Sequence, residues 1–178
     1  MTSQTALPTL AELPFYPYLN AEGGLPMELQ RQIGIYAIFD HEQFLQYVGY
    51  SRDVFQSLRQ HLVRQPNGCW WYKVQTIERP SRSVLENLRQ AWMAESDGFS
   101  LTPEAEAAWV NAIDAKKTMT AEEQAEYAAL GEVAQVKYLK KIARRLEAEI
   151  VKTLEARGVN MELRFNPKLK EEGLLDLK

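Results

Sequence analysis

Two β-forming runs around a short polar segment constrain the fold of this chain more than any other feature. Residues 34–39 read GIYAIF and residues 44–49 read FLQYVG, with the polar residues DHEQ between them. Aromatic and β-branched residues favour strands, and a short polar loop between two strands is typical of a hairpin. We therefore expect a β-hairpin over residues 34–49.

Helical spacing replaces strand character directly after the hairpin. Val54, Leu58 and Leu62 recur every four residues, which puts them on one face of a helix. Asp53 stands just before them, where a carboxylate stabilises a helix N-terminus. Because Pro66 ends the pattern, we expect a helix of about three turns here.

A third β-like run and a second helical pattern complete the first half of the chain. Residues 70–77 are rich in aromatic and β-branched residues, and helical spacing returns from Ser83 to Trp92. The element order up to residue 98 is then β-β-α-β-α. It predicts the fold class α/β, with a small mixed β-sheet flanked by helices and a C-terminal helical extension.

Helical patterns dominate the second half of the chain. Thr102 before a proline is typical of a helix start, and Thr120 with Glu123 has the spacing of a capping box. From there we expect one long amphipathic helix that ends near Gly158, because apolar residues recur every three or four positions. Residues 161–165 alternate like a short strand, and a polar tail follows.

The composition divides the chain into four segments. Proline and paired glycines crowd the N-terminal region, which we expect its aromatic residues to anchor on the domain. The predicted segments are a Pro-rich arm at 1–30, an α/β domain at 31–100, a helical extension at 101–158 and a C-terminal tail at 159–178.

Composition and charge narrow the functional classes. With 46% hydrophobic and 25% charged residues, the chain has the amino-acid composition of an average globular protein, which excludes wholesale disorder. A net charge of -3 argues against a surface built entirely for nucleic acid, but it leaves room for a local basic patch. The single cysteine, Cys69, excludes an intrachain disulfide, and no signal peptide or transmembrane segment is evident. We expect a cytoplasmic protein.

Two triplets inside the predicted hairpin carry a family resemblance. They are Gly34-Ile35-Tyr36 and Tyr47-Val48-Gly49, with ten residues between the two tyrosines. Their spacing, the hairpin and the helix that follows resemble the GIY-YIG nuclease family. The resemblance covers about residues 33–97, which makes the segment 31–100 a GIY-YIG-like domain.

One branch of that family is more similar than the rest. The stretch 44–62, FLQYVGYSRDVFQSLRQHL, resembles the cyanobacterial and plastid branch, in which such a domain is fused ahead of a chloroplast monothiol glutaredoxin. This resemblance suggests a photosynthetic source.

The resemblance implies metal-assisted hydrolysis of a DNA phosphodiester. By position, Tyr36 and Tyr47 would serve the nucleophile and the phosphate, and His61 would transfer a proton or contact the phosphate. Glu86 would hold Mg²⁺ or Mn²⁺, because a carboxylate binds a hard cation through oxygen.

One departure from the family pattern weakens this activity. Active members have an arginine ten positions after the second tyrosine, and this chain has Ser57 there. A neutral hydroxyl cannot make the bidentate phosphate contact of a guanidinium, so we expect weak or degenerate catalysis. Arg52, at the helix start, is the candidate substitute. The alternative is a non-catalytic interaction module that docks a protein partner through its C-terminal helices.

Each candidate also has a plain structural interpretation. Tyr36 and Tyr47 can be packing residues, Glu86 can be a solvated charge, and His61 can be an ordinary helix residue. Cys69, beside two tryptophans, is either a buried small hydrophobe or a redox thiol.

A basic run marks the predicted long helix. Four of its cations fall near one face: Lys137, Lys141, Arg144 and Arg145. Such a face can contact DNA phosphates or an acidic protein partner, or it can be a solvated surface balanced by nearby glutamates.

Overall fold

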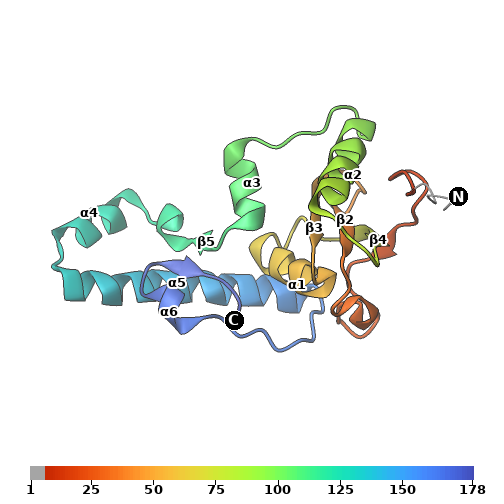
Figure 1. Ribbon diagram of the computed structural model, residues 1–178. Helices are drawn as coiled ribbons and strands as arrows, with labels where there is room; N and C mark the ends of the chain where they lie inside the picture. The colour runs from red at the N-terminus through yellow and green to blue at the C-terminus, as the bar shows by residue number, and fades with distance from the viewer. Residues whose placement is uncertain (1–6) are drawn as a thin grey trace, which may run out of the picture.

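The computed structural model describes residues 7–178 of the chain (Figure 1). Its main sheet has the strand order β1-β4-β2-β3. The strands are β1 (Tyr16–Pro17), β2 (Gly34–Phe39), β3 (Leu45–Ser51), β4 (Trp71–Thr76), β5 (Ile113–Asp114) and β6 (Leu174–Leu175). The helices are η1 (Met27–Leu29), α1 (Val54–Arg64), α2 (Arg82–Glu95), α3 (Pro103–Val110), η2 (Ala115–Thr118), α4 (Ala121–Ala129), α5 (Glu132–Ala156) and α6 (Pro167–Lys170).

The predicted fold class is confirmed: a small sheet is flanked by helices and followed by a helical extension. The sheet is antiparallel in every pairing of the described strands, so the expectation of a mixed sheet was wrong. Strands β3 and β4, joined through α1, do run in the same direction. They lie on opposite sides of β2, however, so no parallel neighbours result.

Strand alternation divides the sheet into two packed faces. One face carries Tyr36 and Tyr47 and packs against α1, and the other carries Ile35 and Val48 and packs against Trp92 of α2. All six residues of β2 are buried because both faces are covered by helices. The motif tyrosines therefore point toward α1.

The N-terminal arm packs on the domain through its aromatic residues. Tyr18 is fully buried and its hydroxyl donates a hydrogen bond to the Leu58 carbonyl. Phe15 meets Phe39 edge-on at 4.7 Å between ring centroids, and the Lys73 ammonium lies 4.2 Å from the centre of the Phe15 ring. This arm closes the second face of the sheet.

Most of the predicted helix starts are confirmed. The Asp53 carboxylate accepts from the backbone of residue 56, and Thr120 with Glu123 forms the expected capping box. Helix α2 starts earlier than predicted, because Ser81, not Ser83, accepts from the first turn.

The single long helix predicted from residue 120 was wrong. Leu130 and Gly131 have extended backbones, and Gly131 is the N-cap of α5. Helix α4 lies over the first part of α5 (Figure 1), and Glu123 of α4 pairs with Arg145 in the middle of α5 at 2.7 Å. The break lets these two helices pack against each other.

The C-terminal tail is part of the core. Leu175 is fully buried in β6, which pairs with β5, and Phe165 forms an isolated bridge with Leu177. The strand predicted at 161–165 is otherwise absent from the described residues. Side chains of α5 and the tail join the core cluster that holds Tyr36. Among residues 7–178, none of the helices combines the length and apolarity that a bilayer crossing requires.

Candidate functional site

The two motif glycines are required by close approach inside the sheet. A Cβ on Gly34 would stand 2.6 Å from the Gln75 carbonyl oxygen of the neighbouring strand β4. A Cβ on Gly49 would stand 2.7 Å from the Tyr47 ring and 3.0 Å from the Tyr36 hydroxyl. Gly34 therefore lets β4 approach β2 closely, and Gly49 leaves room for the side chains of the two tyrosines, which gives the sequence motif a physical basis.

Tyr36, Tyr47 and His61 form a compact cluster between β2, β3 and α1. The Tyr36 hydroxyl and His61 Nε2 share a hydrogen bond of 2.8 Å. The Tyr47 and His61 rings lie 4.8 Å apart between centroids. The structure thus brings together three of the residues proposed from the sequence, and we call them the tyrosine–histidine cluster.

Burial controls the ionisation of this cluster. Tyr36 is 3% exposed, Tyr47 7% and His61 4%. Burial raises the pKa of both phenols, and burial together with the Arg64 charge lowers the pKa of His61 to about 3. At neutral pH the cluster consists of two neutral phenols and a neutral imidazole, so in this conformation it can donate and accept hydrogen bonds but carries no charge.

Trp109 of α3 covers the tyrosine–histidine cluster. Its ring lies parallel to that of Tyr47, with 10° between the planes and 5.4 Å between centroids, and edge-on to His61 at 5.5 Å. Trp109 is itself buried, and Tyr47 borders a small pocket of about 200 Å³ that α3 lines through Glu106.

Arg64 is the positive charge nearest to the cluster on α1. Its guanidinium donates to the Trp109 carbonyl at 3.0 Å and to Asp176 Oδ2 at 2.9 Å. Its Nε, like Asp176 Oδ1 and His61 Nδ1, is buried without a hydrogen-bond partner. The ion pair with Asp176 links the C-terminal tail to the cluster.

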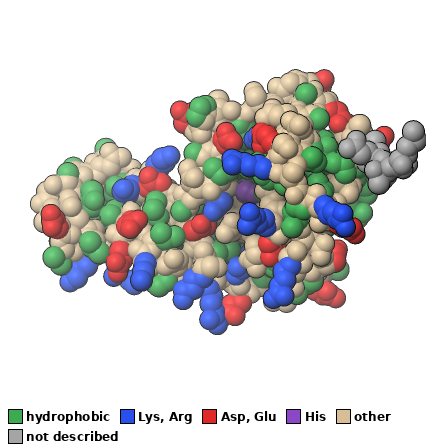
Figure 2. All heavy atoms as spheres, in the orientation of Figure 1, with side chains coloured by type: hydrophobic (Ala, Val, Ile, Leu, Met, Phe, Trp, Pro, Cys, Tyr) green, Lys and Arg blue, Asp and Glu red, His purple; other side chains and the backbone are tan. Residues whose placement is uncertain are grey.

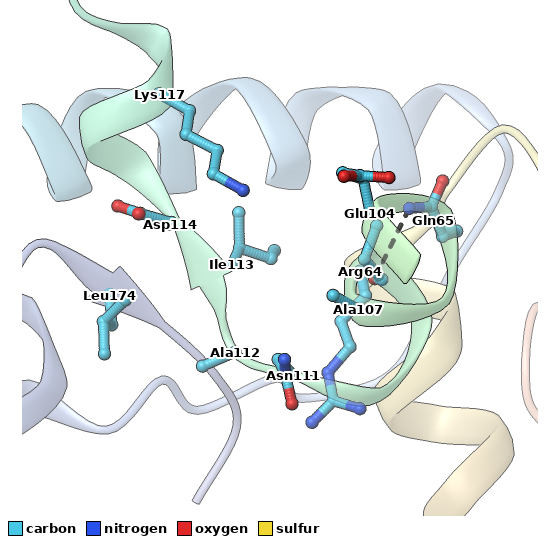
Figure 3. A pocket seen from close by; sticks show the side chains of 11 residues that line it. Arg64, Gln65, Glu104, Ala107, Asn111, Ala112, Ile113, Asp114, Lys117 and Leu174 are labelled. Atoms are coloured by element: carbon cyan, nitrogen blue, oxygen red, sulfur yellow. Dashed lines mark hydrogen bonds between the residues drawn. The ribbon is translucent and has the colours of Figure 1, made fainter. Parts of the chain in front are cut away.

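A pocket of about 450 Å³ lies beside α3 and leads to Arg64 (Figure 3). Figure 3 shows Arg64 and Lys117 entering it from different elements, with Asn111 beside the guanidinium. The acidic residues Glu104 and Asp114 share the same walls. With both signs of charge around it, the pocket has no clear preference for an anion or a cation.

Ser57, at the position where the sequence resemblance led us to expect an arginine, is hydrogen-bonded within the domain. Its hydroxyl donates to the Ser51 hydroxyl at 2.7 Å, which ties α1 to the end of β3. Ser57, His61 and Arg64 follow at i, i+4 and i+7, so all three share one face of α1. The spacing was visible in the sequence, but it was not used to identify Arg64.

Glu86 lies apart from the tyrosine–histidine cluster. Its Oε1 accepts from Gln90 at 2.9 Å and from Arg89 at 3.3 Å, and no hydrogen bond among the described residues joins it to Tyr36. Hydrogen bonding by Gln90, with help from Arg89, holds the pKa of Glu86 below its usual value, so the carboxylate is ionised at neutral pH.

Glu86 offers a cation one carboxylate, whose Oε1 already accepts from Arg89 and Gln90. The described residues contain no group of three or more His, Cys, Asp or Glu side chains that could enclose a metal. Mg²⁺ commonly keeps several waters and binds through one carboxylate plus phosphate oxygens, and Glu86 is accessible enough to act in this way.

Arg89, another residue that the sequence did not point to, joins α2 to the rest of the site. Its Nε donates to the Val48 carbonyl at 3.0 Å on the outer edge of β3. Its other nitrogens pair with Glu86 and, at 3.5 Å, with Glu106 of α3. Arg89 thus connects the candidate metal ligand to the helix that carries Trp109.

Arg52 lies outside the cluster. It is exposed just after the end of β3 and lines a different pocket together with Arg82. As a substitute for the arginine missing at position 57, Arg52 would have to lie beside the tyrosines, and the structure does not bring it there.

Cys69 is fully buried and its surroundings hold it protonated. Burial raises the pKa of its thiol to about 12. A redox thiol needs thiolate character and access to reagents, so this environment favours the interpretation of Cys69 as a small buried hydrophobe.

The basic run lies on the outer face of α5, where Lys and Arg side chains are spaced along the helix (Figure 2). Arg145 is paired with Glu123, whereas Lys137, Lys141 and Arg144 are exposed and have no ion pair among the described residues. Three of the four candidate contact residues are therefore available to a partner.

Comparison with known proteins gives one relationship and no family assignment. No protein-family model matches the chain. The chain is similar to the bifunctional monothiol glutaredoxin-S16 of Arabidopsis thaliana chloroplasts, with 31% identity over 91 residues. The match covers 51% of this chain but only 29% of that protein. The similarity relates this chain to one portion of the glutaredoxin protein.

Proposed function

We propose that this chain is a GIY-YIG-type domain that hydrolyses DNA phosphodiesters weakly with the help of Mg²⁺ or Mn²⁺. The observation that supports this most is the hydrogen bond between Tyr36 and His61, with Tyr47 against the same imidazole. The residues of the two triplets thus meet on one face of the sheet, as a shared phosphate site requires.

Each residue would have a separate task in this reaction. Glu86 would hold the cation, which supplies positive charge and lowers the pKa of a bound water. Burial keeps the Tyr36 phenol neutral, so its hydroxyl would donate a hydrogen bond to a phosphate oxygen. The neutral His61 imidazole, which is hydrogen-bonded to that hydroxyl, would keep it oriented. Tyr47 would contact the phosphate from the neighbouring strand.

Two features account for weak catalysis. Ser57 supplies no charge to the developing phosphorane, and removing one such group typically costs about 3–4 kcal/mol of transition-state stabilisation. Trp109 lies against the Tyr47 ring, and the low exposure of the tyrosines would limit the access of a phosphate. The buried thiol of Cys69 is compatible with a reducing compartment, and we propose the cytoplasm.

A second candidate function is a non-catalytic module that binds a protein partner through its C-terminal helices. The observation that favours it is a partly apolar surface on α5: Val133 is 76% exposed and Val136 38% exposed, and the unpaired Lys137 follows. An acidic partner with an apolar patch would match this surface.

Cleavage and its dependence on Glu86 separate the two functions. We expect Mn²⁺-dependent nicking of supercoiled DNA by the wild type and loss of nicking in Glu86→Ala. Glu122→Ala, at an exposed position of α4, is the matched control and should nick like the wild type. A folded wild type that does not nick DNA, even at high enzyme concentration, would leave the interaction module as the better account.

A further inference from the structure

Four arginines collect at one end of the main sheet. Strand β2 is antiparallel to both β3 and β4, so the start of β2 and the ends of β3 and β4 lie together. In the pairing, Gly34 stands opposite Ser51 on one side and Thr76 on the other. The arginines that flank these strand ends are all exposed: Arg31, Arg52, Arg79 and Arg82.

A pocket of about 500 Å³ opens at this end of the sheet. Arg52 and Arg82 line it together with the polar residues Tyr50 and Ser51, and apolar side chains including Leu85 complete its walls. It therefore offers two guanidinium groups within one concave surface, which we call the arginine pocket. The Ser51 hydroxyl is already used, because it donates to the Asp53 carbonyl at 2.9 Å.

The charge of the arginine pocket is not neutralised by the protein. Neither Arg52 nor Arg82 forms a salt bridge with any described residue. Of the carboxylates close by in the sequence, Asp53 caps α1 by accepting from a backbone N–H, Glu86 is held by Arg89, and Glu78 is exposed. None of them forms an ion pair with Arg52 or Arg82, so both guanidinium groups of the pocket are free to bind an anion.

One helix N-terminus adds to this potential. Helix α2 begins at Arg82 itself, and its cap is the neutral Ser81, whereas the start of α1 already carries the Asp53 carboxylate. The unpaired N–H groups and the dipole of a helix N-terminus favour an anion. Helix α2 therefore presents its positive end near the pocket.

We propose that the arginine pocket binds a phosphate of the DNA backbone. Guanidinium groups bind phosphate oxygens in a bidentate manner. Leu85, in the pocket wall, precedes Glu86, so a strand held here runs close to the carboxylate proposed to bind the cation. This inference rests on the proposed function and gives Arg52 a binding role in place of the catalytic one.

Salt-dependent binding tests the pocket without any need for cleavage. The probe is a fluorescent DNA duplex measured by anisotropy with a metal chelator present, at a series of salt concentrations. Each phosphate contact contributes about 0.9 to the slope of log affinity against log salt concentration, so Arg52→Gln with Arg82→Gln should lower the slope by about two. The matched control removes two exposed cations elsewhere, Arg164→Gln with Lys178→Gln, and should leave the slope unchanged.

The outcomes keep this inference separate from the proposed function. A slope that falls only in the Arg52/Arg82 variant supports the pocket even when the wild type shows no nicking, which would overturn the nuclease alone. An equal fall in both double variants indicates general electrostatic attraction and overturns the pocket. A wild type that nicks DNA while the Arg52/Arg82 variant binds with unchanged slope overturns the pocket and leaves the nuclease intact.

Discussion

The Trp109 indole lies against the Tyr47 ring at 10° between their planes, although the two residues come from opposite halves of the chain. Through this contact, helix α3 belongs to the same core as the hairpin. The covering of the tyrosine–histidine cluster is therefore a consequence of how the helical extension folds.

Removing the Trp109 ring should destabilise the protein strongly. Trp109→Ala deletes a buried aromatic side chain that contacts both Tyr47 and His61, and such changes typically cost about 3–5 kcal/mol. Urea unfolding measures the loss. Val110→Ala, at the next and partly exposed position of α3, should change the free energy of unfolding by less than about 1 kcal/mol. Equal losses in both variants would contradict the packing described for α3.

The stability of the protein should fall at acidic pH because of His61. Its pKa is lowered to about 3 by burial and by the Arg64 charge, whereas an unfolded histidine titrates near 6.5. Between these values the unfolded state binds a proton that the folded state does not, so unfolding becomes easier by about 1.4 kcal/mol for each pH unit lost. Above pH 6.5 the residue contributes no pH dependence.

A non-titrating variant isolates this effect. His61→Gln can keep a hydrogen bond to Tyr36 but takes up no proton, and the other acidic groups titrate equally in both proteins. The difference in unfolding free energy between wild type and variant should therefore change steadily from pH 6.5 toward pH 4, with the wild type losing more. Parallel curves over this range would show that His61 is protonated in the folded state.

The ion pair between Arg64 and Asp176 should contribute more to the free energy of unfolding than an exposed ion pair does. Asp176→Ala leaves the Arg64 charge buried without its carboxylate, which typically costs about 3–5 kcal/mol. Replacing both residues, as Arg64→Met with Asp176→Leu, should cost less than Asp176→Ala alone. Glu162→Ala, which breaks the exposed pair with Arg164, serves as control and should cost less than about 1 kcal/mol. If Asp176→Ala lowered the free energy of unfolding as little as Glu162→Ala does, the ion pair would not be holding the C-terminal tail to α1.

Cys69 should resist thiol reagents until the protein unfolds. Its thiol is fully buried and its pKa is raised to about 12, so little thiolate is present at pH 8. Labelling with a thiol reagent should be slow in buffer and fast in urea. Asn87→Cys in a Cys69→Ala background places a thiol at an exposed site and should react rapidly in both. Fast native labelling of Cys69 would revive the redox interpretation.

The local features of the fold could be predicted from the sequence because short-range chemistry determines them. The hairpin follows from β-forming runs around a polar loop, and the caps at Asp53 and Thr120 follow from side chains that bond the next turn. The break at Leu130 was missed although Gly131, a residue that often marks a helix boundary, stands in the pattern. The chain reverses there, and α4 pairs with α5 through Glu123 and Arg145.

The tyrosine–histidine cluster was predictable, but its covering was not. The spacing of Tyr36, Tyr47 and His61 places them on neighbouring elements, which the hydrogen bond between Tyr36 and His61 bears out. Trp109 and Asp176 come from segments far along the chain, and no local pattern links them to the hairpin. Arg64 carried a usable signal, since it follows Ser57 and His61 on one helix face.

The most direct test of the account is Mn²⁺-dependent nicking of supercoiled DNA by the wild type, Glu86→Ala and Ser57→Arg proteins, prepared side by side. We predict slow nicking by the wild type, none by Glu86→Ala, and nicking by Ser57→Arg that is faster by up to about a hundredfold, because a guanidinium restores transition-state charge. Nicking by Glu86→Ala at the wild-type rate, or no nicking by folded wild-type and Ser57→Arg proteins, would contradict the proposed nuclease.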